Sequence, residues 1–218
     1  MKPEYRCGTA RRAARAVVPL LCLGLAACDA TLLPAPQPDR TRFFVLSGAG
    51  AAAAEAMPRA AGVRVGLRAV EVPDYLRDRP IAVRRGANEL LLNDYDRWAE
   101  PLDAGIQRVI VQQLLAEPNV SDVVTAPFPI NSPPDYVVSV RILRCEGDTG
   151  AGAGSARLSA EYQISTPGPD SKLVAQRFFV APAAPWGGQN YGRLARLLSA
   201  DVAALARAIA SDVPAKGS

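Results

Sequence analysis

Residues 157–164 read Arg-Leu-Ser-Ala-Glu-Tyr-Gln-Ile, in which polar and apolar side chains alternate at every position. Successive side chains of a β-strand point to opposite faces of a sheet, so this alternation predicts a strand with one buried face. The same signal, or a short apolar run, recurs in further segments: 43–46, 63–69, 81–85, 89–92, 120–124, 136–142 and 173–180. We therefore expect a β-sheet at the centre of the domain.

Two segments carry helical spacing instead. After Pro101, which suits the first turn of a helix, apolar residues recur three or four positions apart as far as Pro118. The same spacing from Leu194 to Ile209 predicts an amphipathic helix of about 20 residues. Because the helices interrupt the series of strands, we expect an α/β fold. It is a single domain over residues 42–213, with a mixed β-sheet of about five to six strands covered by two main helices.

The first 27 residues have the parts of a bacterial export signal. A basic start precedes an apolar run, from Ala16 to Leu25, that is too short to cross a bilayer. Ala26 and Ala27 then lead to Cys28, and this ending resembles the lipoprotein box, in which the cysteine receives a diacylglycerol after cleavage before it. We expect a signal peptide at 1–27, lipidation of Cys28, and a proline-rich tether at 28–41 that reaches roughly 40 Å. An ordinary secretory signal with an incidental cysteine is the alternative.

The charge of the remaining chain gives no reason for nucleic-acid binding. Residues 28–218 carry 20 basic and 20 acidic side chains. The sequence has no histidine, which excludes Ser/His and Cys/His nucleophile pairs and removes the commonest neutral metal ligand. We therefore expect no enzyme activity, no catalytic residue, no cofactor and no metal site. A hydrolase that pairs a serine with Lys172 or Lys216 is the least favoured alternative.

Three further features have plain structural interpretations. Residues 146–155 are glycine-rich but lack the Gly-Lys-Ser/Thr ending of a phosphate loop, so we expect a flexible hairpin connection. Asp94 and Asp96 are spaced like paired acids, yet the absence of a second carboxylate cluster favours a solvated turn. Cys145 ends an apolar run and is expected to be a small core residue.

The most informative polar residues lie in two blocks. The first contains Tyr75 and Arg79, and the second reads Asp-Arg-Trp-Ala-Glu-Pro-Leu over residues 96–102. Trp98 can close the edge of the core while Arg97 and Glu100 pair or cap the following helix. The same residues can instead anchor a partner, because Trp, Tyr and Arg dominate interface hot spots. Both interpretations stay open, with architecture favoured.

These blocks, together with the lipoprotein box, the early Phe-Phe-Val-Leu strand at 43–46 and the closing helix, resemble the ABC-type transport auxiliary lipoprotein family (the PqiC/YmbA group). The resemblance covers most of residues 42–210. It implies a non-catalytic lipoprotein at the periplasmic face of the envelope, whose candidate interface residues are Tyr75, Arg79, Arg97, Trp98 and Glu100.

The resemblance also implies partners and a location. The partners are an MCE-domain protein and the ABC or permease components of an intermembrane lipid transporter, which the lipoprotein would dock to the envelope; a homo-oligomer is compatible with this role. The membrane contact is the lipid anchor. The outer membrane is favoured over the inner, although Asp29, which resembles an inner-membrane retention signal, leaves that choice open. The alternative is a structural lipoprotein of another envelope machine, such as a secretion apparatus or lipopolysaccharide export.

Overall fold

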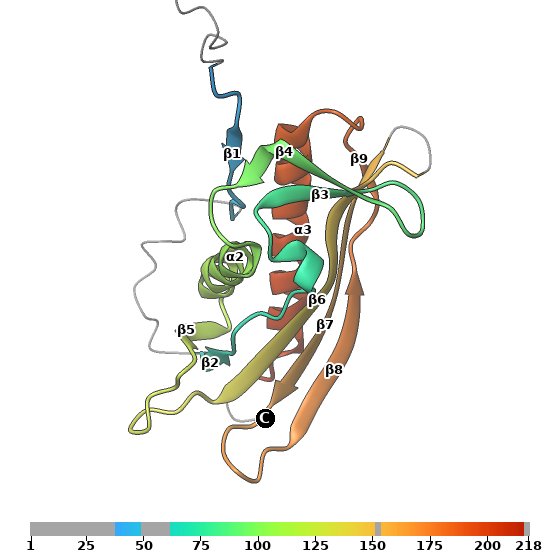
Figure 1. Ribbon diagram of the computed structural model, residues 1–218. Helices are drawn as coiled ribbons and strands as arrows, with labels where there is room; N and C mark the ends of the chain where they lie inside the picture. The colour runs from blue at the N-terminus through green and yellow to red at the C-terminus, as the bar shows by residue number, and fades with distance from the viewer. Residues whose placement is uncertain (1–37, 49–61, 151–153, 216–218) are drawn as a thin grey trace, which may run out of the picture. The chain divides into compact units, whose positions relative to one another are not determined.

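The long strands β6 (Tyr136–Asp148) and β7 (Ser155–Ser165) form the antiparallel centre of the sheet in this computed structural model (Figure 1). The structure describes residues 38–48, 62–150 and 154–215. The predicted signal peptide, Cys28, Asp29, most of the predicted tether, and residues 49–61 and 151–153 lie outside the described residues. The apolar alternation of 157–164 is confirmed, because Leu158, Ala160, Tyr162 and Ile164 are all buried.

The sheet divides on one side of β6. Along that edge, β2 (Val63–Leu67) pairs with the first part of β6 and β3 (Pro80–Arg84) with its end, both in parallel. Beyond β2 lies β5 (Val120–Thr125), and beyond β3 lie β4 (Leu90–Trp98) and then β1 (Arg42–Phe44). On the other side, β7 pairs with β8 (Leu173–Val180) and with the two-residue β9 (Ala184–Pro185).

The helices begin and end where the sequence dictates. Helix α2 (Leu102–Ala116) follows Pro101 and stops at Glu117, whose extended backbone (ψ 136°) is the conformation expected of a residue before proline. Helix α3 (Tyr191–Asp212) is capped by Asn190, whose side chain accepts a hydrogen bond from the Arg193 N–H at 2.9 Å. It ends just before Val213, which also precedes a proline.

Both helices contribute to one core. They pack against each other, and α3 lies behind β6 and β7 (Figure 1). The predicted apolar positions are buried: Leu102, Ile106, Val109, Ile110 and Leu114 of α2, and Leu194, Leu198, Val202, Leu205 and Ile209 of α3. The prediction of a single α/β domain with a mixed sheet and two main helices is therefore confirmed.

The predicted number of strands is too low. Nine strands pair within the described residues, not five to six. Each of the eight segments with a strand signal overlaps one of β1 to β8, so the predicted number was lower than the number of those segments. Strand β9 has only two residues, and so short a strand leaves no periodic signal in the sequence. The described residues contain no helix that is long and apolar enough to cross a membrane.

The connection between β6 and β7 starts later in the glycine-rich segment 146–155 than expected. Residues 146–148 are the last three of β6, and Ser155 opens β7, so only the middle of 146–155 connects the strands. The interpretation as a flexible connection is wrong for Glu146, whose side chain is fully buried.

Candidate functional site

The block at residues 96–102 fastens β1 to the rest of the domain. Strand β1 runs parallel to β4, with Phe44 opposite Trp98. The Ala99 N–H donates to the carbonyl oxygen of Phe44 at 2.8 Å, and Arg42 Nη2 lies 2.6 Å from Asp96 Oδ1. Asp96 is buried, so the expectation of a solvated turn at this aspartate is wrong. The physical reason is the arginine on β1, which compensates the buried carboxylate.

Glu100 helps to attach the chain segment that follows β1 to helix α2. Its Oε1 lies 2.5 Å from Arg108 Nη2 on α2, and that same nitrogen donates to the carbonyl oxygen of Leu46 at 2.8 Å. The Ser47 N–H donates to Ser199 Oγ on α3 at 3.0 Å. Glu100 therefore pairs with a cation of the helix, and the chain that follows β1 is held by both helices.

Trp98 and Arg97 are placed differently. Trp98 is 3% exposed and belongs to the hydrophobic core, which favours the architectural interpretation over a role as an accessible anchor. Arg97 is half-buried, and its Nε is buried without a hydrogen-bond partner within the described part of the chain. The side chain of Arg79 is exposed and donates no hydrogen bond within residues 38–48, 62–150 and 154–215, while its carbonyl oxygen accepts from the Trp98 N–H at 2.7 Å.

A second cluster surrounds Glu146. It lies near the fork of the sheet, by which we mean the edge of β6 where β2 and β3 pair with different parts of the same strand. Arg84 on β3 contacts both carboxylate oxygens, with Nε 2.6 Å from Oε1 and Nη2 3.3 Å from Oε2. Arg144 Nε donates to Oε1 at 2.9 Å. Two arginines thus compensate one buried carboxylate, and the contact made by Arg84 joins β3 to β6. This two-pronged contact is the strong form of an ion pair.

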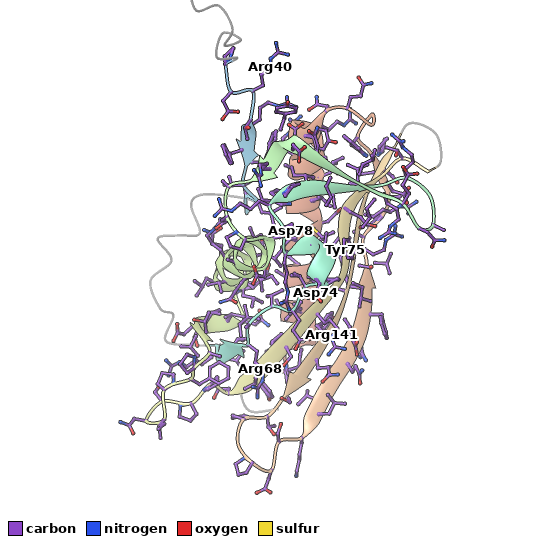
Figure 2. All side chains as sticks on the ribbon, in the orientation of Figure 1. Arg40, Arg68, Asp74, Tyr75, Asp78 and Arg141 are labelled. Carbon is purple, nitrogen blue, oxygen red and sulfur yellow. The ribbon has the colours of Figure 1, made fainter. Side chains whose placement is uncertain are left out.

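Tyr75 covers this cluster from the short 3-10 helix η2 (Asp74–Leu76), where Figure 2 labels it. The Arg84 guanidinium carbon lies 5.7 Å from the centre of the Tyr75 ring. Burial, and secondarily the negative charge of Glu146, raise the pKa of Tyr75 to about 12, so the phenol stays protonated at physiological pH. Of the predicted site residues, only Tyr75 joins this cluster.

Sequence reasoning missed Glu146 and Arg84. The available signal was weak: Arg144 and Glu146 are two apart, which places both on one face of a strand. Their partner Arg84 lies 62 residues from Glu146, and no local pattern connects them.

The surface beside the cluster is a shallow depression of about 590 Å³, lined in part by Tyr75, Arg84, Leu143, Arg144 and Asp148. The described residues that line it include no serine, cysteine or lysine. A second depression of about 240 Å³ contains Arg68 and Arg141, which Figure 2 shows farther along the sheet. There Arg141 Nε pairs with Glu71 Oε2 at 2.9 Å, but both side chains are mostly exposed, so this pair contributes little stability.

Cys145 is 2% exposed, as expected of a core residue. Burial, and then the charge of Asp201, raise the pKa of its thiol above the usual range, so it is a poor nucleophile. The described residues contain no group of three or more acidic or cysteine side chains that could hold a metal ion.

A protein-family model described as the ABC-type transport auxiliary lipoprotein component matches residues 44–210. The chain belongs to this family. The resemblance inferred from the motif blocks is therefore confirmed, and residues 96–102, which fasten β1, lie inside the matched part of this auxiliary lipoprotein.

Two solved structures share its fold. A crystal structure of an uncharacterized protein superimposes with a TM-score of 0.62 at 18% identity, covering 80% of this chain and 99% of the other. Protein XCC0632 from Xanthomonas campestris gives a TM-score of 0.64 at 15% identity, covering 78% of this chain and 93% of the other. No curated protein matches the sequence significantly.

Asp201 on α3 makes the stability of the auxiliary lipoprotein depend on pH. Its Oδ2 is buried and has no hydrogen-bond partner among the residues described, and burial raises the pKa of this carboxyl from 3.8 to about 6. The folded state therefore favours the protonated form, so this group's contribution to stability is complete below about pH 4 and is lost as the pH rises through about 6.

We expect Asp201→Asn to raise the free energy of unfolding at pH 7.5 by about 1 kcal/mol, a value discounted because the residue as a whole is only partly buried. At pH 4 the variant and the parent should be nearly equal. Urea titrations at the two pH values measure both differences. A gain of the same size at pH 4 would show that charge is not the cause.

Proposed function

We propose that this chain is a lipid-anchored, non-catalytic auxiliary component of an ABC/MCE-type intermembrane lipid transport system. It docks the transport partner to the periplasmic face of the envelope, with the outer membrane as the favoured site. The family match over residues 44–210 is the observation that carries the proposal. The lipoprotein box at Cys28 and the proline-rich tether support it from the sequence.

The attachment of β1 supports a docking role. If Cys28 is lipidated, a pulling force between the membrane and the domain would act on β1, because that strand follows the tether directly. The ion pair between the exposed Arg42 and the buried Asp96, together with the hydrogen bond between Ala99 and Phe44, holds this strand to β4. A domain that connects a partner to a membrane needs such a firm joint at the tether.

Arg79 is the candidate partner residue that the structure leaves most accessible. Its side chain is exposed and makes no ion pair within the described residues, so a partner carboxylate could reach it without breaking the fold. Tyr75 lies nearby in the sequence, on η2. Arg77 is a matched control, because it is an exposed arginine of the same segment but pairs with Asp74 at 3.3 Å.

The proposal is tested by purifying the tagged lipoprotein from cross-linked envelopes and identifying the associated proteins by mass spectrometry. We expect an MCE-domain protein and ABC or permease components, and a recovery that falls at least about fivefold with Arg79→Glu but not with Arg77→Glu. Light scattering on the same preparation counts the copies of the chain. Recovery of secretion or lipopolysaccharide-export components instead would favour the alternative envelope machine.

A further inference from the structure

Strand β8 is an edge of the sheet that carries apolar side chains into solvent. Within the part of the chain that the structure describes, it pairs only with β7, and Figure 1 shows it at the margin of the sheet. Phe178 and Val180 are 71% and 72% exposed, and Gln176, which shares their face of the strand, is exposed as well. An exposed apolar edge of this kind is a template for pairing with another strand.

The pairing with β7 shows which backbone groups of β8 point to the open edge. The Ala181 N–H donates to the carbonyl oxygen of Leu158 at 3.0 Å, so this pair belongs to the hydrogen-bonded set of the antiparallel ladder. Hydrogen-bonded and non-hydrogen-bonded pairs alternate along such a ladder. Gln176, Phe178 and Val180 therefore direct their N–H and C=O groups away from β7. The outward backbone groups and the exposed side chains thus belong to the same three residues.

This edge lacks the usual protection against pairing. Exposed edges in natural sheets are commonly blunted by charges, prolines or bulges. Residues 175–180 contain no proline and one charged side chain, Arg177, whose Nε lies 3.4 Å from Asp212 Oδ2 on α3. The irregularity in the pairing with β7 falls before this segment, between Leu173 and Ala175. Residues 175–180 are therefore a regular strand whose outward face is uncharged.

We propose that two copies of this chain pair through β8, antiparallel about a two-fold axis at Phe178, and form one continuous sheet. A pairing centred on Arg177 would place two arginines directly opposite each other, which is unfavourable. A pairing centred on Gln176 would include the irregular start of the strand. Centred on Phe178, the pairing uses only the regular segment, and the two aromatic rings lie next to each other.

A second copy matches this edge in both hydrogen bonding and charge. In the register centred on Phe178, each Gln176 faces Val180 of the second copy, so outward backbone groups meet outward backbone groups along the whole contact. No charged side chain stands opposite a like charge. The same surface serves both copies, as a two-fold axis requires. The proposal depends neither on the transport role nor on the lipid anchor.

The test uses the chain from residue 28 with Cys28→Ser, which contains every residue that the structure describes. Analytical ultracentrifugation from about 1 to about 200 µM should show a monomer–dimer equilibrium. Phe178→Lys should weaken association at least about tenfold, because the aromatic contact is lost and two like charges meet at the axis. Tyr95→Lys is the matched control: this ring is 59% exposed but lies on β4, which is paired on both edges, and dimerisation should not change.

Mixing two variants separates a broken contact from a damaged fold. Phe178→Glu should weaken association as Phe178→Lys does. An equimolar mixture of the two variants should dimerise again, because opposite charges then face each other across the axis. A tag on the lysine variant recovers the glutamate variant and measures this pairing. A chain that had simply failed to fold would not be rescued by its mixture.

Cysteine cross-linking tests the register. Phe178→Cys should give a disulfide-linked dimer under mild oxidation, whereas Gln176→Cys should not, because the two copies of residue 176 would lie about 13 Å apart along the strands. Cys145 is buried and should not compete. A chain that stays monomeric over the whole concentration range, a mixture of Phe178→Lys and Phe178→Glu that does not dimerise, or cross-linking at 176 but not at 178 would overturn the proposal.

Discussion

Glu146→Ala is expected to lower the free energy of unfolding by about 3–5 kcal/mol, the range for breaking a buried ion pair from one side. The carboxylate is fully buried, whereas the side chains of Arg84 and Arg144 are 20% and 38% exposed. Removing the carboxylate leaves Arg84, the more buried arginine, without its principal counter-charge. The effect should concentrate where β3 joins β6, because Arg84 and Glu146 stand on those two strands.

Urea unfolding followed by circular dichroism measures this loss, and hydrogen exchange locates it. Glu89→Ala is the matched control: Glu89 also pairs with an arginine, Arg85, at 3.5 Å, but both side chains are more than half exposed. We expect the control to change stability by less than about 0.5 kcal/mol. A similar small loss for Glu146→Ala would mean that the arginines relax into solvent and that the cluster does not hold the fork of the sheet.

Cys28→Ser is expected to abolish labelling by fatty acid and to release the chain from washed membranes. Each buried methylene of an acyl chain contributes about 0.8 kcal/mol, so several chains hold a protein firmly. Metabolic labelling and fractionation in high salt measure the two effects.

Cys7→Ser serves as the control, because Cys7 lies in the predicted signal peptide, ahead of its apolar run. It should leave labelling and fractionation unchanged. A Cys28→Ser chain that still carries fatty acid, or that resists the high-salt wash, would contradict the proposed anchor.

Part of the candidate site was readable in the sequence. The Arg-Trp-Ala-Glu-Pro-Leu run stands out because it combines an aromatic residue with opposite charges before a helix, and the structure places Trp98 in the core and Glu100 against Arg108. Its connection to β1 was not predicted. The ion-pair partner of Asp96 is Arg42, which belongs to a strand distant in sequence, and a solvated turn is the ordinary expectation for an isolated aspartate.

The sequence by itself determined the kind and position of the elements. Periods of two and of about 3.6 residues report which side of a strand or helix is apolar, and prolines at 101, 118 and 214 set helix limits through local backbone sterics. Only the tertiary structure decided the burial of Asp96 and Glu146. Periodicity assigns a side chain to a face, but it carries no information on which distant strand will bring an arginine to that face.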